Sequence, residues 1–280
     1  MIFVFLLVTR VLAGQTIQDI SDTSVHASFR GLSVVDDNVV WVSGTKGNVG
    51  HSEDGGLHWK WNAVPGCELL DFRSLYAFDA KKAIVASAGT PAVIFLTADG
   101  GKNWQEIFRS TDTLMFFDGM DFWDELHGII FGDPVNGKLF LMETLDGGLT
   151  WNEMKESERP VLEKGEAAFA ASGTTIRTEG ESEVWIATGG TRSRLWHSAD
   201  YGHSWTDLAT PIIQGLPSTG IFSFALAKKN TVLIIGGNYS QQNIFDLDPE
   251  TTKVTSSEGM SVHVTGSAQC AIGLNGIVGS

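Results

Sequence analysis

An eight-residue motif occurs four times in this chain and restricts its fold more than any other feature. Its form is Ser/Thr-x-Asp-x-Gly-x-x-Trp, and the copies end at Trp59, Trp104, Trp151 and Trp205, at intervals of 45, 47 and 54 residues. A single copy could arise by chance, whereas four copies at a similar spacing are a strong signal. They indicate a chain built from tandem repeats of one supersecondary unit.

The residue types of the motif are those of a tight turn. Ser, Thr and Asp side chains hydrogen-bond to nearby backbone N–H groups, and Gly tolerates a positive φ. The Trp then begins the next strand and buries its ring against the hairpin. A catalytic or metal-binding set is disfavoured because each copy falls in a different repeat. We therefore predict a structural role for the motif residues Ser52, Asp54, Gly56, Trp59, Thr97, Asp99, Gly101, Trp104, Thr144, Asp146, Gly148, Trp151, Ser198, Asp200, Gly202 and Trp205.

Two short apolar runs precede each motif and are typical of β-strands. In the first repeat they are residues 29–35 and 38–43, rich in β-branched and aromatic side chains. Outside residues 156–164, no segment shows the 3.6-residue apolar period of a helix. With the strands before and after the motif, each repeat supplies four strands, which make one propeller blade. The sequence predicts an all-β protein, a β-propeller of four-stranded blades.

Five blades are recognisable, and a partial sixth follows them. The predicted boundaries are 29–65, 66–110, 111–160, 161–215 and 216–260, with 261–280 as the partial blade. We expect the first strand of the fourth blade at residues 167–171. In the fifth blade, residues 220–226, 231–237 and 244–247 fit the first three strands, and the motif is replaced by residues 248–252.

The two ends of the repeat array do not match in strand number. Residues 16–25 occupy the place of an outer strand without a blade of its own, so we expect them to close the ring. Residues 266–272 resemble the first strand of a sixth blade. We predict a propeller that has six blades when complete and is cut short at its carboxyl end. A five-bladed ring with residues 266–280 as a tail is the alternative.

The amino terminus resembles a short signal peptide. An apolar run at residues 2–8 is followed by Val-Leu-Ala, with cleavage expected near Ala13. An apolar first strand or a misplaced start is the alternative. The run is too short to span a bilayer and no other stretch qualifies. We therefore expect an exported protein (periplasmic, secreted or at the cell surface) with one propeller domain at residues 14–280 and no membrane span.

The net charge limits the possible partners, and the cysteines limit the possible disulfides and metal sites. The 33 acidic and 19 basic residues give a net charge of −14, which disfavours binding to nucleic acid. Cys67 and Cys270 fall on non-neighbouring blades, so we expect two buried free thiols rather than a disulfide. No Cys/His spacing is typical of a zinc site. The sequence predicts no cofactor and no metal.

The motifs together resemble those of a known group of propellers. The four octapeptides, the Phe-Arg pairs at 29–30 and 72–73, residues 132–134 and residues 188–190 are similar to the BNR-type, or Asp-box, propellers of the photosystem II assembly factor (Ycf48/Hcf136-like) type. The resemblance covers about residues 16–275. It implies a sialidase-like fold and a non-catalytic scaffold that binds protein or peptide partners, in the thylakoid lumen if the organism is photosynthetic. It implies nothing about the oligomeric state.

Sialidases carry the same Asp boxes, so a glycoside hydrolase with its active site at the channel mouth is the alternative function. Such an enzyme needs arginines that clamp a carboxylate, a Tyr activated by a Glu, and an Asp acid/base. Tyr201 lies inside a box, which leaves Tyr76 and Tyr239, and no Glu is evidently placed to activate Tyr239. We favour the scaffold, with a glycan as a possible ligand.

Candidate binding residues are those expected on the channel face, namely Arg30, Arg73, Asp133, Arg192, Arg194 and Tyr239. Arg30 and Arg73 hold the same register in adjacent innermost strands. We therefore expect both guanidinium groups at one end of the propeller, opposite the boxes, as an anchor for a peptide or carboxylate. Simple ion pairs are the alternative. Asp118 and Asp121 are expected to point to opposite faces and to be solvated loop or turn residues.

Overall fold

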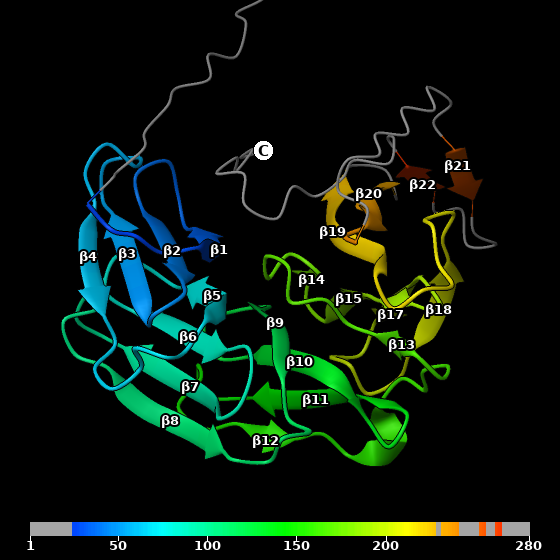
Figure 1. The fold of residues 1–280 in the computed structure, drawn as a ribbon, viewed down its shortest axis with the longest axis horizontal. Coiled ribbons are helices and arrows are strands. Elements are labelled where there is room, and N and C mark those ends of the chain that lie inside the picture. Colours follow the sequence, from blue (N-terminus) through cyan, green and yellow to red (C-terminus); the bar gives the residue numbers. More distant parts are fainter. Residues whose placement is uncertain (1–23, 228–230, 241–251, 256–260, 265–280) are drawn as a thin grey trace, which may run out of the picture.

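The computed structural model describes residues 24–227, 231–240, 252–255 and 261–264, the last two ranges by their backbone alone. Within these ranges the chain forms β-strands and one short 3-10 helix, η1 (Glu156–Glu158). The strands build five sheets arranged around a common centre (Figure 1). The fold is therefore the predicted β-propeller, with five four-stranded blades.

The first four blades follow the chain order, and their strands pair antiparallel. Blade 1 contains β1 (Phe29–Val34), β2 (Val40–Gly44), β3 (Asn48–Ser52) and β4 (Lys60–Ala63). Blade 2 contains β5 (Phe72–Ala77), β6 (Ala83–Ser87), β7 (Ala92–Thr97) and β8 (Gln105–Ser110). Blade 3 contains β9 (Phe117–Phe122), β10 (Gly128–Val135), β11 (Lys138–Thr144) and β12 (Asn152–Glu153). Blade 4 contains β14 (Ile176–Glu179), β15 (Glu183–Ala187), β17 (Arg194–Ser198) and β18 (Thr206–Ala209).

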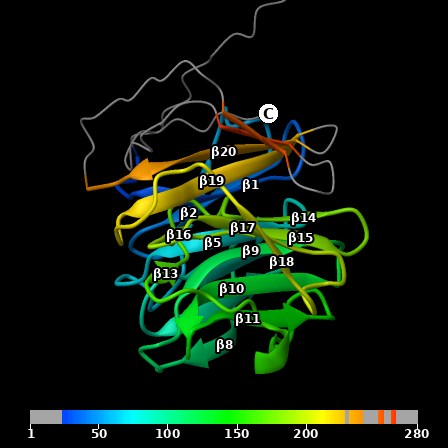
Figure 2. The same cartoon turned by 90° about the vertical axis from the view of Figure 1, so that its right-hand side faces the viewer.

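Blade 5 departs from this regular pattern. It contains β19 (Thr219–Ala227), β20 (Thr231–Asn238), β22 (Ser261–Val264) and β21 (Thr252–Thr255), and β22 pairs parallel to β20. Two short strands, β13 (Glu166–Ala167) and β16 (Gly189–Gly190), extend its inner edge beyond β19. Figure 2 shows β19 and β20 stacked over the strands of blade 4.

Two sequence-based boundaries are wrong. Residues 167–171 are not the first strand of blade 4, because Ile176–Glu179 takes that place. Residues 261–264, part of the predicted partial sixth blade at 261–280, pair within the fifth sheet. The expected strands at 244–247 and 266–272, the signal peptide, and most of the closing strand at 16–25 lie outside the described residues.

The core lies between neighbouring blades. Side chains alternate along each strand, so a middle strand faces one neighbouring blade with odd positions and the other with even positions. Ile84 of β6 packs toward blade 3, and the adjacent Val85 packs toward blade 1. Four such clusters join the five blades in sequence. Burial on both faces explains why β6 and β7 consist of apolar and small residues throughout.

Each Asp box connects the third and fourth strands of its blade through the same hydrogen bonds. The first hydroxyl accepts the N–H of the fifth-position Gly at 2.8–3.0 Å and donates to the box Asp at 2.8–3.0 Å. That Gly adopts φ between +77° and +91° in all four boxes, where a β-carbon is disfavoured. The motif thus acts as a hydrogen-bonded turn.

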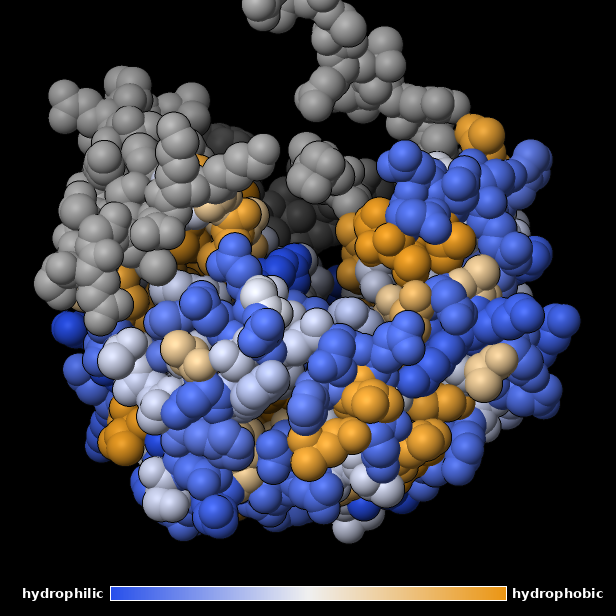
Figure 3. Space-filling view, turned by 180° about the vertical axis from the view of Figure 1, so that it is seen from behind, coloured by the Kyte–Doolittle hydropathy of each residue, from blue (hydrophilic) through white to orange (hydrophobic). Residues whose placement is uncertain are grey.

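The face seen in Figure 3 is largely hydrophilic, with apolar residues gathered in separate patches. Within the described residues, no helix is long and apolar enough to cross a membrane. Cys67 is a buried free thiol, as predicted, whereas Cys270 lies outside the described residues.

Candidate functional site

A β-bulge interrupts the first strand of the four-stranded unit in four of the five blades. The pairing register shifts across Arg30 in β1, Arg73 in β5, Asp118 in β9 and Phe222 in β19. A bulge leaves one residue outside the ladder and re-aims its side chain. The four residues therefore occupy equivalent places, and we call them the bulge cluster. Successive innermost strands pack against one another, which brings these places around the centre of the ring.

The bulge cluster lies at the end of the propeller opposite the boxes. Phe72, beside Arg73, pairs with the last residue of β6, whereas Thr97, the first residue of the second box, pairs with the first residue of β6. Phe29, beside Arg30, likewise pairs with the last residue of β2. Both arginines thus lie at the end expected from their register, which we call the bulge end. Their role in binding stays a prediction.

The guanidinium of Arg73 is oriented by two hydrogen bonds. Its Nε donates to Asp71 Oδ2 at 2.7 Å, and its Nη1 donates to the carbonyl of Ala170 at 3.2 Å. The backbone of Arg73 is also closely packed. A β-carbon added to Gly31 or Gly173 would lie 3.4 or 3.1 Å from the Arg73 carbonyl oxygen. The guanidinium is therefore oriented before any ligand arrives.

Asp118 and Asp133 form a pair of carboxylates beside Arg73. Burial, and next the charge of Asp133, raise the pKa of Asp118 well above its usual value, while Arg73 and the Ala170 backbone oppose the rise. Burial likewise raises the pKa of Asp133, and the Ala168 backbone lowers it. Asp118 is only 1% exposed, and its Oδ2 has no hydrogen-bond partner among the described residues.

The prediction that Asp118 and Asp121 are solvated loop residues is wrong. Both lie on β9, and burial raises the pKa of each. Their surroundings differ, because Asp121 accepts the N–H of Thr178 at 2.8 Å from blade 4. The sequence argument missed this burial because β9 contacts the neighbouring innermost strands on both sides.

A segment of the chain itself occupies the bulge end. Residues 168–170, which we call the strap, run past Arg73, Asp118 and Asp133, and these three side chains face backbone groups of the strap. The ring of Phe169 lies against the backbones of Gly189 and Gly220, where a β-carbon would collide with it. Charged side chains of β5, β9 and β10 thus hold a stretch of backbone that lies outside regular secondary structure.

Aromatic side chains line the neighbouring part of the bulge end. Phe169 contacts Phe222 at 5.4 Å and Tyr239 at 6.0 Å between ring centroids. Tyr239 directly follows β20 and is 40% exposed. The structure therefore places Tyr239 near the strap, as part of an aromatic wall.

One arginine predicted for the channel face, Arg194, lies elsewhere. Arg194 begins β17, the third strand of blade 4, and binds Glu166 through two bonds, with Oε1 at 3.1 Å and Oε2 at 2.5 Å. It is buried and also pairs with Asp207, so its placement on the channel face is wrong. Arg192 lies in the β16–β17 loop, with Glu163 at 3.8 Å.

Sequence reasoning missed three parts of this site, namely Asp71, Phe222 and the strap. The signal for Phe222 was present, because the Phe-Arg pairs at the strand starts recur as Phe117-Asp118 and Ile221-Phe222. Asp71 precedes the second Phe-Arg pair by one position. The strap gave no such signal, because its Ala-rich run resembles a buried strand.

Comparison with known proteins agrees with this architecture. Residues 15–113, which contain blades 1 and 2, match the family "Photosynthesis system II assembly factor YCF48". No match was found among curated proteins.

Solved structures with similar folds are distant in sequence. A protein from Lactobacillus plantarum is 10% identical with a TM-score of 0.53, over 85% of this chain and 70% of that one. A GH74 xyloglucanase from Xanthomonas campestris is 13% identical with a TM-score of 0.51, over 84% of this chain and 38% of the enzyme. A structure described as YCF48 bound to D1 peptide is 16% identical with a TM-score of 0.42, over 75% of both chains. The resemblance predicted from the motifs is confirmed by the family match over residues 15–113, and the fold of the described residues is an Asp-box β-propeller.

Proposed function

We propose that this protein is a non-catalytic scaffold that binds an extended segment of a partner protein at the bulge end. The observation that carries the proposal is the strap. Arg73, Asp118 and Asp133 already face the main chain of residues 168–170. Recognition through backbone groups suits an extended peptide of varied sequence, and the aromatic wall offers contacts for its side chains. The match of residues 15–113 to an assembly-factor family supports the same function.

The glycoside hydrolase alternative fits these surroundings less well. A clamp for a substrate carboxylate needs arginines that present their N–H groups to the ligand. Arg73 already pairs with the Asp71 carboxylate, which competes with a substrate carboxylate for the guanidinium, and Arg194 is buried against Glu166. Tyr239 packs against Phe169 and Phe222, a setting that does not activate a nucleophile.

The proposal is tested by cross-linking in the native host. We expect a tagged wild-type chain to enrich a specific partner, and Arg73→Met to lose it. Arg109→Met is the matched control, because Arg109 lies on the outer strand β8 and pairs with Glu106 at 2.9 Å. Both variants are first checked for an unchanged melting temperature. Equal enrichment by Arg73→Met and wild type would contradict the proposed site.

A second assay separates the scaffold from the enzyme. Fluorogenic sialosides and other glycosides are incubated with the protein at acidic and neutral pH. We expect no turnover above a buffer control. Turnover that is lost in Tyr239→Phe would instead support the hydrolase.

Export belongs to the same proposal and rests on residues 1–13. If these residues are a signal peptide, the protein recovered from outside the cytoplasm begins at or near Gly14. Amino-terminal sequencing of that fraction tests it, and a mature protein that retains Met1 contradicts it.

A further inference from the structure

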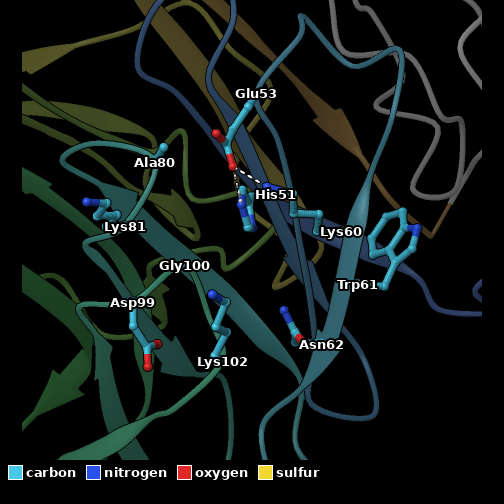
Figure 4. A pocket seen from close by; sticks show the side chains of 10 residues that line it. All are labelled: His51, Glu53, Lys60, Trp61, Asn62, Ala80, Lys81, Asp99, Gly100 and Lys102. Carbon is cyan, nitrogen blue, oxygen red and sulfur yellow. Dashed lines mark hydrogen bonds and ion pairs between the residues drawn. The ribbon is translucent and has the colours of Figure 1, made fainter.

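A second site lies between blades 1 and 2, away from the bulge cluster. It is a cavity of about 340 Å³ whose wall includes His51, Glu53, Lys60, Asn62, Lys81 and Lys102 (Figure 4). The three lysines come from three separate elements: strand β4, the turn between β5 and β6, and the second Asp box. In Figure 4 the side chains of Asn62 and Lys102 point into the cavity, the Lys60 ammonium lies beside Glu53, and Lys81 lies at the edge with its ammonium turned outward. We call this cavity the lysine pocket.

Both carboxylates that line the lysine pocket, those of Glu53 and Asp99, already have hydrogen-bond partners within the protein. Glu53 binds Lys60 and lies 3.3 Å from His51 Nε2. Asp99 accepts from the Thr97 hydroxyl at 3.0 Å and from both the backbone and the side chain of Asn103, at 2.9 and 2.6 Å. Within the described part of the chain, no ion pair of Lys81 or Lys102 is found. Three lysines against the two carboxylates of Glu53 and Asp99 leave a formal charge of +1 in the pocket, in a protein whose net charge is −14.

The internal repeat shows that the fold does not require these lysines. Each box is hydrogen-bonded to the turn between the first and second strands of its blade. A backbone N–H of the box donates to the carbonyl of one residue in that turn. That residue is Asn38, Lys81, Leu126 or Ser182 in the four blades. The box position equivalent to Lys102 is Leu57, Leu149 or His203. Between blades 2 and 3 both equivalent side chains are leucines, exposed by 57% and 54%.

The same comparison applies to the strand that follows the box. Lys60 opens β4, whereas Gln105, Asn152 and Thr206 open the fourth strands of the next three blades. All three positions are therefore free to vary, and lysine occupies all three only around this one cavity. A structural requirement would recur in each blade, so the cluster points to a ligand.

We propose that the lysine pocket binds a phosphate-type oxyanion, either as a free phosphate compound or as a lipid headgroup. Ammonium groups bind phosphate as point charges, and hydrogen bonds between charged partners are about twice as strong as neutral ones. A tetrahedral anion with several charges can contact donors from separate elements at once, which a single carboxylate cannot do as well. Asn62 supplies a neutral donor on the same wall.

Calorimetric titration with pyrophosphate at constant ionic strength tests the proposal. We expect saturable binding to the wild type, weakened about tenfold or more in Lys102→Gln, since one charge-assisted bond contributes roughly 1.5–3 kcal/mol and 1.4 kcal/mol is tenfold. Lys155→Gln is the control, because it removes the same charge from an exposed lysine paired with Glu158. An equal loss in Lys155→Gln would show nonspecific attraction and overturn the proposal.

A second experiment, vesicle co-sedimentation, distinguishes a free phosphate compound from a lipid headgroup as the ligand. Co-sedimentation uses phosphatidylglycerol vesicles, with phosphatidylcholine vesicles as the neutral comparison. Pyrophosphate binding without vesicle binding assigns a soluble phosphate compound. Phosphatidylglycerol binding that is lost in Lys102→Gln assigns a lipid headgroup. The absence of saturable binding to either probe overturns the proposal, and neither result depends on the partner protein proposed for the bulge end.

Discussion

Two threonines bind the same aspartate of an Asp box, and their hydrogen bonds predict that replacing them lowers the free energy of unfolding by different amounts. In the third box, Thr144 is fully buried, donates to Asp146 Oδ1 at 2.9 Å and accepts the N–H of Gly148 at 2.9 Å. Thr150 is exposed and donates to Asp146 Oδ2 at 2.6 Å. Valine has the shape of threonine without the hydroxyl, so Thr→Val removes the bonds and leaves the packing.

The expected cost follows from what each substitution leaves without a partner. Thr144→Val strands the buried N–H of Gly148, which costs roughly 1–3 kcal/mol, and removes one further hydrogen bond of about 1 kcal/mol, for a total of about 2–4 kcal/mol. Thr150→Val leaves Asp146 Oδ2 exposed to water, which can replace the lost donor, so this substitution costs about 0.5 kcal/mol.

Urea unfolding followed by tryptophan fluorescence measures both free energies of unfolding. Thr97→Val in the second box is an internal replicate, because Thr97 makes the same two bonds at 3.0 Å and is 1% exposed. It should match Thr144→Val rather than Thr150→Val. Equal costs for Thr144→Val and Thr150→Val would refute the argument that burial of the donor decides the stability of the box.

Three further predictions concern stability. Gly148→Ala should destabilise by about 1–3 kcal/mol more than Gly137→Ala in thermal or urea unfolding, since both have a positive φ but only at Gly148 would the new β-carbon collide with an isoleucine methyl, at 2.1 Å. Burial lowers the pKa of His51 below 6.5 despite Glu53, so the unfolded state binds more protons and stability should fall as pH drops below about 6.5, with a smaller fall in His51→Phe in urea titrations at several pH values. Arg194→Met should cost about 3–5 kcal/mol by the same unfolding assay, because it leaves the buried Glu166 carboxylate unpaired, and a loss under 1 kcal/mol would contradict this.

The parts of the fold set by local sequence could be predicted. The boxes, the strands beside them and the matched places of Arg30 and Arg73 follow from turn chemistry and from the period of the repeat, which depend on few residues at short range. The bulges themselves could not be foreseen. They appear only when two strands are aligned, as the shift across Asp118 shows.

The errors share a cause in long-range packing. The run at 167–171 has the composition of a strand, but the ring of Phe169 packs against the backbones of Gly189 and Gly220. The strand that pairs with β15 is Ile176–Glu179. Arg194 looked like a channel residue because no short-range pattern reveals its partner Glu166, which is 28 residues away. A charged residue that forms an ion pair inside a blade cannot be told from one that faces a ligand by its neighbours in the sequence.

The repeat itself separates positions that hold the fold from positions that are free to acquire a function. The box hydroxyl, Asp and Gly keep the same bonds in four blades, and the interblade core buries each middle strand. The bulge residue, by contrast, is Arg, Arg, Asp or Phe, and the turn residue that anchors the box is Asn, Lys, Leu or Ser. Both variable positions use a fixed backbone geometry to present a side chain at an end of the propeller. The bulge end and the lysine pocket can therefore change independently, since a substitution at either one leaves the box and the interblade contacts intact.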